Sequence, residues 1–210
     1  IRDRVIAPGY ICSNEKGETS NLGRGGSDYS AAIYAKYVNA KVLEIWTDVS
    51  GVFSANPKIV KKASPIEFLS YKEAMELSFF GAKVIYFPTL QPLIEDNIPV
   101  FIKNTFDPSA EGTCISNSTK LDNDEIVKGI SHIENISILN FEGSGMVGVP
   151  GFSKRFFEAL SSNQVNVVMI TQASSEFSIC IAINSNDAQL AKPVSYTHLR
   201  AHETKANLVC

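Results

Sequence analysis

A glycine-rich stretch, residues 22–28, imposes a tight loop directly before a helix. Three of the four residues from Gly23 to Gly26 are glycines, and without a Cβ they let backbone N–H groups approach a ligand closely. Ser27 or Asp28 is expected to cap a helix that starts at about Tyr29. Free N–H groups and the positive end of the helix dipole would then face the loop, which favours an anion there.

Arg24 strengthens the prediction of an anion site in this loop. Its planar guanidinium can hold a carboxylate or a phosphate at two points. Tight turns use the same residue types, so a surface turn with a satisfied cap is the plain alternative for Arg24 and Ser27. The combination of glycines, an arginine, a hydroxyl and an acid beside a helix start is what indicates binding.

Composition and charge exclude several classes of protein. The 210 residues are 44% hydrophobic and 20% charged, as in an ordinary soluble globular protein of one large or two small domains. A net charge of −3 gives no reason to expect nucleic acid or an anionic membrane as a partner. No apolar run approaches the roughly 18 residues that span a bilayer.

The cysteines indicate a cellular compartment for the protein, and the first residue indicates whether the chain is a piece of a longer one. The four cysteines are scattered without metal-ligand spacing, which indicates reduced thiols and a cytoplasmic location, and no protein metal site is expected. The chain starts at Ile1 rather than at a methionine, and no signal peptide precedes it, so we expect it to be a piece of a longer protein.

Helix and strand patterns alternate along the first half of the chain, which predicts an α/β layer architecture. A strand at residues 42–46 is mostly apolar, so both faces of its sheet are expected to be covered. Thr47 and Asp48 follow that strand, where ligands bind in open α/β sheets, although Asp48 also suits a plain turn. A later helix is predicted from a capping box of Ser70 and Glu73.

The second half has a different composition and a different order of elements. Residues 116–125 form a polar linker, the best candidate for a domain boundary. A strand, a helix and two more strands are predicted beyond it, at residues 136–141, 152–160, 165–171 and 177–183. This order opens a ferredoxin-like unit, which needs another helix and strand to close. Residues 187–191 could begin that helix, but Pro193 interrupts it.

Two motifs resemble the aspartokinase family within the amino acid kinase superfamily. Residues 46–53, Trp-Thr-Asp-Val-Ser-Gly-Val-Phe, are similar to a nucleotide-site segment shared across the superfamily. The glycine-rich stretch with the Tyr-Ser-Ala-Ala that follows it is particular to aspartokinases, and residues 80–84, Phe-Gly-Ala-Lys-Val, agree with it. The part after the linker resembles an ACT domain, a regulatory amino-acid-binding module. Residues 143–151 and 170–176 are most similar to threonine-regulated enzymes fused to homoserine dehydrogenase.

The resemblance implies a domain plan for the chain. Residues 1–115 would be the C-terminal part of a three-layer α/β/α amino acid kinase domain, residues 116–126 a linker, and residues 127–192 an incomplete α+β ferredoxin-like ACT domain. In the family a strand just after the linker pairs within a neighbouring ACT unit, and here it would be residues 127–130. Residues 193–210 stop resembling the family and look like a translated sequencing adaptor, so they are set apart from the fold.

The family reaction moves the γ-phosphoryl group of ATP to the β-carboxylate of L-aspartate, which needs positioning and charge neutralisation more than covalent chemistry. By resemblance, Arg24 pairs with a substrate carboxylate, and Ser27 and the N–H groups of Gly25 and Gly26 assist it. Asp28 orients the transferring end of the site, so Arg24 and Asp28 are the candidate catalytic residues.

Six residues match family positions that hold ATP: Thr47, Asp48, Phe53, Lys58, Lys83 and Val84. Lys83 is the candidate for neutralising phosphate charge together with Mg²⁺. For Lys58 a solvated charged face is nearly as plausible, because other lysines adjoin it. Gln172 is similar to a position that contacts the regulatory amino acid, for which a plain turn is an equal alternative. Threonine is expected as that regulator rather than lysine, and association through ACT domains implies a homo-oligomer.

Several departures from the family pattern affect the expected activity. Phe53, Asn56 and Lys58 stand where family members often have tyrosine, aspartate and arginine, which predicts a weaker ATP site rather than loss of the reaction. The family's Lys-Phe-Gly-Gly segment, with its catalytic lysine, does not occur in the chain. We therefore expect no kinase activity from these 210 residues alone.

Three other functions compete with this interpretation. One is a non-catalytic ACT module that binds threonine or lysine, and another is a different amino acid kinase, such as one acting on glutamate. The glycine-rich stretch and the ACT part argue against the second. A Rossmann dinucleotide site is a poor third, because the glycines lack the final spacing. The aromatic residues Phe79, Phe80 and Tyr86 are expected in the core.

Overall fold

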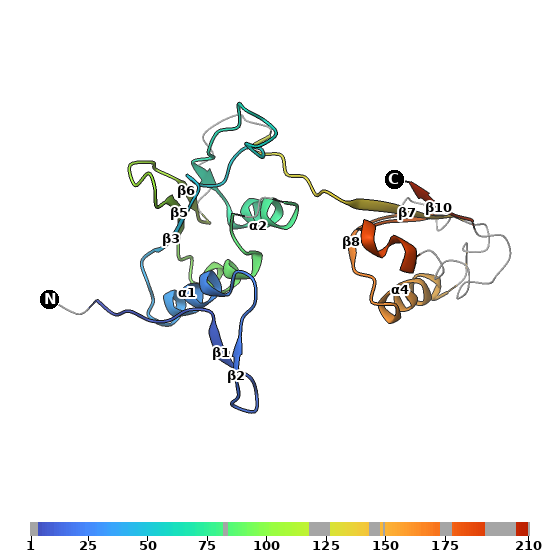
Figure 1. Cartoon of the computed structure of the whole chain (residues 1–210), viewed down its shortest axis with the longest axis horizontal. Coiled ribbons are helices and arrows are strands. Elements are labelled where there is room, and N and C mark those ends of the chain that lie inside the picture. Colours follow the sequence, from blue (N-terminus) through green and yellow to red (C-terminus); the bar gives the residue numbers. More distant parts are fainter. Residues whose placement is uncertain are drawn as a thin grey trace. The chain divides into compact units, whose positions relative to one another are not determined.

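Residues Ile1–His132 and Ile133–Cys210 form separate units of the computed structural model (Figure 1). The structure describes residues 4–81, 84–117, 127–142, 148, 150–172, 178–191 and, as backbone, 205–209. No helix in these ranges is long and apolar enough to cross a membrane.

A mixed four-stranded sheet organises the first unit. Its strands are β3 (Leu43–Thr47), β4 (Phe68–Leu69), β5 (Val100–Asn104) and β6 (Thr113–Ile115), in the order β3-β5-β6-β4. β3 runs parallel to β5 with Thr47 opposite Asn104, β5 is antiparallel to β6, and β6 is parallel to β4. A small antiparallel hairpin, β1 (Ile11–Ser13) and β2 (Thr19–Asn21), stands apart from this sheet.

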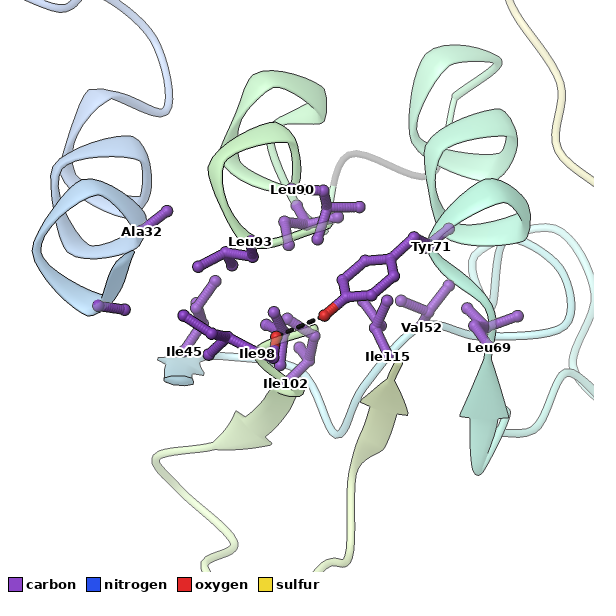
Figure 2. Packing of buried hydrophobic residues seen from close by; sticks show 14 residues of the cluster. Ala32, Ile45, Val52, Leu69, Tyr71, Leu90, Leu93, Ile98, Ile102 and Ile115 are labelled. Atoms are coloured by element: carbon purple, nitrogen blue, oxygen red, sulfur yellow. Dashed lines mark hydrogen bonds between the residues drawn. The ribbon is translucent and has the colours of Figure 1, made fainter. Parts of the chain in front are cut away.

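Three helices cover one face of the sheet and bury the core of the unit between them and the strands (Figure 2). They are α1 (Gly26–Tyr37), α2 (Tyr71–Phe79) and α3 (Gln91–Ile94), the last preceded by the 3-10 turn η1 (Phe87–Thr89). Inside the core the hydroxyl of Tyr71 donates a hydrogen bond of 2.5 Å to the carbonyl of Ile98. Burial raises the pKa of Tyr71 to about 12.

The opposite face of the sheet is not covered by any described element. Trp46 is 46% exposed there, and the ammonium of Lys103 lies 3.3 Å from the carboxylate of Glu44 and 5.5 Å from the centre of the Trp46 ring. The prediction that both faces of the sheet are covered is therefore wrong for the described residues. Side chains alternate between the two faces along each strand. Glu44 of β3 and Lys103 of β5 therefore lie on the face opposite the buried residues of these strands.

Helix α2 begins and ends as its sequence predicts. The side chain of Ser70 accepts a hydrogen bond from the N–H of Glu73, and the Glu73 carboxylate accepts one from the N–H of Ser70 at 2.7 Å. This confirms the capping box. Phe80 closes the helix, and Gly81 follows it with a φ of +129°, which suits glycine.

Residues 127–132 differ from the prediction for them. They form no strand, and they pack within the first unit, which extends to His132. The Ile130 N–H donates to the carbonyl of Ser54 at 2.8 Å, so the hydrogen bonding that the prediction assigned to a neighbouring ACT strand goes to a loop of this unit.

The second unit is an antiparallel sheet with one long helix against it. Its elements are β7 (Ile136–Glu142), α4 (Phe152–Ser162), β8 (Val167–Gln172), β9 (Ser178–Asn184) and β10 (Lys205–Val209), and the sheet order is β10-β7-β9-β8. Phe141 and Phe156 stack at 5.1 Å between sheet and helix, and both are fully buried. The order and directions confirm the ferredoxin-like prediction.

The fourth strand of this sheet comes from the C-terminal tail. The sequence sets residues 193–210 apart from the fold, yet Lys205–Val209 pairs antiparallel with β7. Without this pairing, β7 would be an edge strand with unpaired N–H and C=O groups. After β9 a 3-10 turn, Ser185–Asp187, leads into helical residues 188–191, where the sequence predicts that a second helix begins.

Candidate functional site

Helix α1 starts three residues earlier than predicted. Its first residue is Gly26, and Gly25 takes the N-cap position with a φ of +72° and without a side-chain cap. The prediction that Ser27 or Asp28 caps the helix is therefore wrong, and both lie in its first turn. A left-handed glycine can end the loop by backbone geometry alone, since the Gly26 N–H donates to the Gly23 carbonyl at 3.1 Å.

The first turn of α1 offers two free backbone donors. Within the described part of the chain, the N–H groups of Ser27 and Asp28 donate to no other group, whereas the Gly26 N–H is already used. Free N–H groups at a helix start, together with the helix dipole, favour an anion. Of the two predicted donors, the Gly26 N–H is thus used within the loop, whereas the Gly25 N–H, like those of Ser27 and Asp28, donates to no other described group.

The two charged residues of the loop differ in their surroundings. Arg24 is exposed and makes no ion pair or hydrogen bond within the described residues. Asp28 is half-buried and likewise lacks an ion-pair partner there, and burial raises the pKa of its carboxyl above the ordinary value. A partly buried carboxylate without a cation is a common mark of a functional site.

Tyr86 packs directly against the glycine-rich loop. A Cβ added to Gly25 would overlap with the Tyr86 side chain, so glycine is required at this point both by φ and by space. The contact places the predicted substrate loop beside the chain segment that includes Val84. Tyr86 is 37% exposed and Phe79 is 54% exposed, so their predicted core positions are wrong, while Phe80 is partly buried.

Residues 9–10 also contact the glycine-rich loop and the start of α1, which the sequence did not predict. The N–H of Tyr10 donates to the Ser30 hydroxyl at 2.9 Å, and that hydroxyl donates to the Gly26 carbonyl at 2.8 Å. Gly9 approaches Ser27 so closely that an added Cβ would lie 3.3 Å from the Ser27 Cα. The only sequence signal was the Pro-Gly break at residues 8–9, which reads equally as an ordinary turn.

Thr47 and Asp48 lie together at the carboxyl end of β3, as predicted. Thr47 is the last residue of the strand, and its hydroxyl donates to the Asp48 carboxylate at 3.2 Å. Asp48 is exposed. A hydrogen bond of 2.9 Å from the Asn104 amide to the Ser50 hydroxyl ties the following turn to the end of β5. Both strand ends therefore hold the turn in place.

Phe53 and Lys58 belong to one loop, residues 53–65, which is closed at its base by a buried threonine. The Thr113 hydroxyl accepts from the Val52 N–H at 2.8 Å and donates to the Ile66 carbonyl at 2.6 Å. Phe53 itself bridges to Pro65 across the loop and is partly buried. The base of the loop is rigidly tied to β6.

Asn56 organises the tip of this loop. Its side-chain oxygen accepts from the Lys58 N–H at 3.0 Å, and its carbonyl accepts from the N–H groups of Ile59 and Val60. An asparagine oxygen serves this turn as an aspartate oxygen would, so the departure at residue 56 leaves the local hydrogen bond possible. Lys58 is exposed and unpaired within the described chain.

The remaining predicted residues are placed as follows. Val84 is partly buried and packs against the core of the first unit, whereas Lys83 lies outside the described residues. Gln172 is the last residue of β8, is exposed, and stands opposite Ile179 of β9. Within the described ranges, no group of three or more His, Cys, Asp and Glu could hold a metal ion.

The structure thus joins some of the predicted residues and leaves others apart. Gly25 meets the segment after Val84 through Tyr86, Thr47 meets Asp48, and Phe53 shares a loop with Lys58. In the described part of the chain, no hydrogen bond or ion pair links these three groups to one another or to Arg24.

Two family models match the chain, one in each half. Residues 2–104 match the amino acid kinase family and residues 139–198 match an ACT domain, a match that runs past residue 192. The chain is 47% identical over 193 residues to the bifunctional aspartokinase/homoserine dehydrogenase of Haemophilus influenzae, which covers 92% of this chain and 24% of that protein.

Two solved structures have a similar fold. One is E. coli aspartokinase III in complex with aspartate and ADP, at a TM-score of 0.76 and 32% identity. The other is the same enzyme in complex with lysine and aspartate, at 0.73 and 31%. Each match covers 95% of this chain and 45% of the other, so the chain spans less than half the length of the proteins it matches.

Proposed function

The chain belongs to the aspartokinases, and from this membership we propose that it serves ATP-dependent phosphorylation of the β-carboxylate of L-aspartate. In that reaction a carboxylate oxygen attacks the γ-phosphorus, the bond to the ADP oxygen breaks, and 4-phospho-L-aspartate and ADP are formed. The predicted resemblance to this family is confirmed, with its amino acid kinase and ACT parts.

The observation that carries the proposal is the contact of Tyr86 with Gly25. It joins the start of α1, with its free N–H groups, to the segment that follows the predicted nucleotide residues Lys83 and Val84. A phosphoryl transfer requires the acceptor and the nucleotide to be held at adjoining places, since positioning supplies much of the rate.

The residues around α1 suit the binding of aspartate. Arg24 is exposed and unpaired in the described chain, so its guanidinium is available to grip a carboxylate at two points. The N–H groups of Ser27 and Asp28 would bind a second anionic oxygen. Asp28 would orient the reacting end, and the glycines at 25 and 26 let the substrate approach the backbone.

Nucleotide binding is assigned to residues from three segments: Thr47, Asp48, Phe53, Lys58, Lys83 and Val84. The relative crystallised with ADP supports ATP as the phosphoryl donor. Mg²⁺ would arrive with the nucleotide, bound largely by phosphate oxygens, and would neutralise charge on the transferring group. Lys58 and Lys83 would bind phosphate as point charges.

Regulation by an amino acid forms the second half of the proposal. The ACT match and the relative crystallised with lysine support a regulatory amino acid in this family. We assign that role here to threonine rather than lysine, with Gln172 in contact with it and ACT domains pairing in a homo-oligomer. The choice of threonine rests on the resemblance of residues 143–151 and 170–176 to threonine-regulated enzymes.

The experiment is a calorimetric titration of the chain with ADP and then with L-aspartate, repeated on two arginine variants. Arg24→Ala should weaken aspartate binding about tenfold to a hundredfold, the loss expected for a charged hydrogen-bonded pair. Arg4→Ala is the control, because Arg4 is also exposed but lies outside the proposed site. Amino acid binding without any ADP binding would instead support a non-catalytic ACT module.

A further inference from the structure

Residues 128–132, which we call the strap, lie against both the loop of residues 53–65 and helix α2. We propose that the strap positions Phe53 and Lys58 for nucleotide binding, so that Lys128, Gly129 and the backbone of Ile130 are positioning residues of the nucleotide site. The inference rests on the function proposed above, because it takes that loop to contact the nucleotide. In Figure 1 the strap lies within the yellow segment that precedes β7 in the chain.

The central contact of the strap is with Ser54, the neighbour of Phe53. The Ile130 N–H donates to the Ser54 carbonyl at 2.8 Å. Ser54 also joins the two ends of the loop, which we call its neck. Its N–H donates to the Ser64 carbonyl at 2.8 Å, and its hydroxyl accepts from the Ser64 N–H at 3.2 Å. The strap is thus hydrogen-bonded to the residue that closes the loop.

Gly129 lets the strap lie close to its neighbours. An added Cβ would be 3.3 Å from the end of the Ile66 side chain, 3.4 Å from that of Leu77 and 3.4 Å from the Ser54 carbonyl. The strap therefore passes between the far end of the loop and helix α2. A side chain at this position would be in close contact with all three neighbours.

Lys128 fixes the strap to α2 through a partly buried ion pair. Its ammonium lies 3.0 Å from the Glu73 carboxylate, the same group that caps α2 through Ser70. Burial alone would raise the pKa of Glu73, but the hydrogen bonds from Ser70 and Lys128 outweigh it, and the pKa is lowered. The Glu73 carboxylate is therefore charged wherever the chain is folded at neutral pH.

The last contact of the strap is with Gly81. An added Cβ there would overlap with the carbonyl of His132, so the strap also contacts the residue that follows the C-cap of α2. In the sequence Gly81 precedes the predicted Lys83 by two positions, as Ser54 follows Phe53 by one. The strap touches the chain next to both segments of the proposed nucleotide site.

Through these contacts the strap restrains the position of the loop of residues 53–65. Residues 57–62 of the loop are exposed and have no described core to rest on. Thr113 holds the base of the loop through Val52 and Ile66, and Ile130 holds it through Ser54. Releasing Ile130 leaves the base intact but lets the neck, and with it Phe53 and Lys58, change position.

The test compares two substitutions of one exposed residue in the full 210-residue chain. Ile130→Pro removes the N–H that bonds to Ser54, whereas Ile130→Ala keeps it and shortens only a side chain that is 68% exposed. ADP affinity is measured by calorimetry, and amide hydrogen exchange is followed over residues 53–65. Ile130→Pro should lower ADP affinity and speed exchange by about threefold to tenfold, the range for one lost hydrogen bond, and Ile130→Ala should change neither.

A second pair of variants keeps the test valid if proline prevents folding. Lys128→Met should act in the same direction as Ile130→Pro, and Lys128→Arg should restore wild-type behaviour. Lys36→Met is the control, since it breaks the 2.7 Å ion pair of Lys36 with Glu95 in the same unit, away from the loop. It should leave ADP affinity and exchange of the loop unchanged.

The possible outcomes distinguish a failure of the strap proposal from a failure of the proposed nucleotide site. Wild-type ADP affinity and unchanged loop exchange in Ile130→Pro and Lys128→Met would overturn the inference. The same follows if these variants only unfold at a lower temperature, because the strap would then merely stabilise the unit. Faster loop exchange in a chain that binds no ADP even as wild type would support the strap and contradict the proposed nucleotide site.

Discussion

At the scale of single residues, the half-buried carboxyl of Asp28 links stability to function. Burial raises its pKa in the folded chain above the value of 3.8 that it has when exposed. The folded state then binds more protons than the unfolded state between the two pKa values, so this group's contribution to stability falls as pH rises through that interval. At neutral pH the charged Asp28 carboxylate therefore lowers the stability of the fold, a loss that proteins commonly tolerate at a substrate site.

We therefore expect Asp28→Asn to raise the stability of the chain at pH 7, with the difference fading below pH 3.8. The same substitution should weaken aspartate binding, since the proposed site loses its orienting carboxylate. Urea unfolding at several pH values and calorimetry measure the two effects. A less stable variant at pH 7 would show that the Asp28 carboxylate stabilises the fold instead.

Tyr71 provides a test of the core of the first unit. Its side chain is 2% exposed, and its hydroxyl satisfies the Ile98 carbonyl. Tyr71→Phe should lower the free energy of unfolding by about 1–2 kcal/mol, because a buried acceptor loses its donor. Tyr37→Phe, at a residue 81% exposed, should change it by less than about 0.5 kcal/mol. Equal stability of the two variants in urea would contradict the described core.

At the scale of elements, local signals decided which boundaries could be predicted. Helix α2 carries its own start in Ser70 and Glu73 and its own end in Gly81, so side chains and a glycine mark both termini. The start of α1 was missed because Gly25 caps it by backbone conformation, which leaves no side-chain signal. Residues 127–130 correspond to a strand in the family, but Ile130 instead bonds to Ser54, which lies more than seventy positions away.

The end of α2 offers a matched pair of glycines. Gly81→Ala introduces a side chain that collides with the His132 carbonyl, whereas Gly17→Ala meets nothing within 4 Å, although both glycines have positive φ. The Gly17 variant should lose about 1 kcal/mol of stability from backbone strain alone. The Gly81 variant should lose more and should speed amide exchange at Ile130. Equal losses and an unchanged Ile130 amide would show that the strap does not rest on Gly81.

At the scale of the whole molecule, the order of strands was harder to predict than their existence. The ferredoxin-like pattern of the second unit could be predicted from the order of its strands and helix. Its fourth strand could not, because it comes from Lys205–Val209, whose pairing with β7 is set by tertiary contacts. In the first unit, the apolar residues 42–46 suggested a sheet covered on both faces, while Glu44 and Lys103 mark an outward face in the described part.

The candidate site was predictable only in its parts. The glycine-rich loop and the residues after β3 could be found from spacing and resemblance, because each part is continuous in sequence. Their supports could not: Tyr10 behind α1, Tyr86 against Gly25 and Ile130 on Ser54 all join distant segments. Such contacts carry no local pattern, so sequence reasoning finds binding residues more readily than the residues that hold them.

The central claim is that the start of α1 and the loops after β3 form one site for aspartate and a nucleotide. Its most direct test is NMR of the ¹⁵N-labelled chain, titrated with ADP and Mg²⁺ and then with L-aspartate. ADP should shift the amide signals of Thr47, Asp48 and residues 53–58, and aspartate should then shift those of Ser27 and Asp28. Shifts confined to the second unit, or none with either ligand, would contradict the claim.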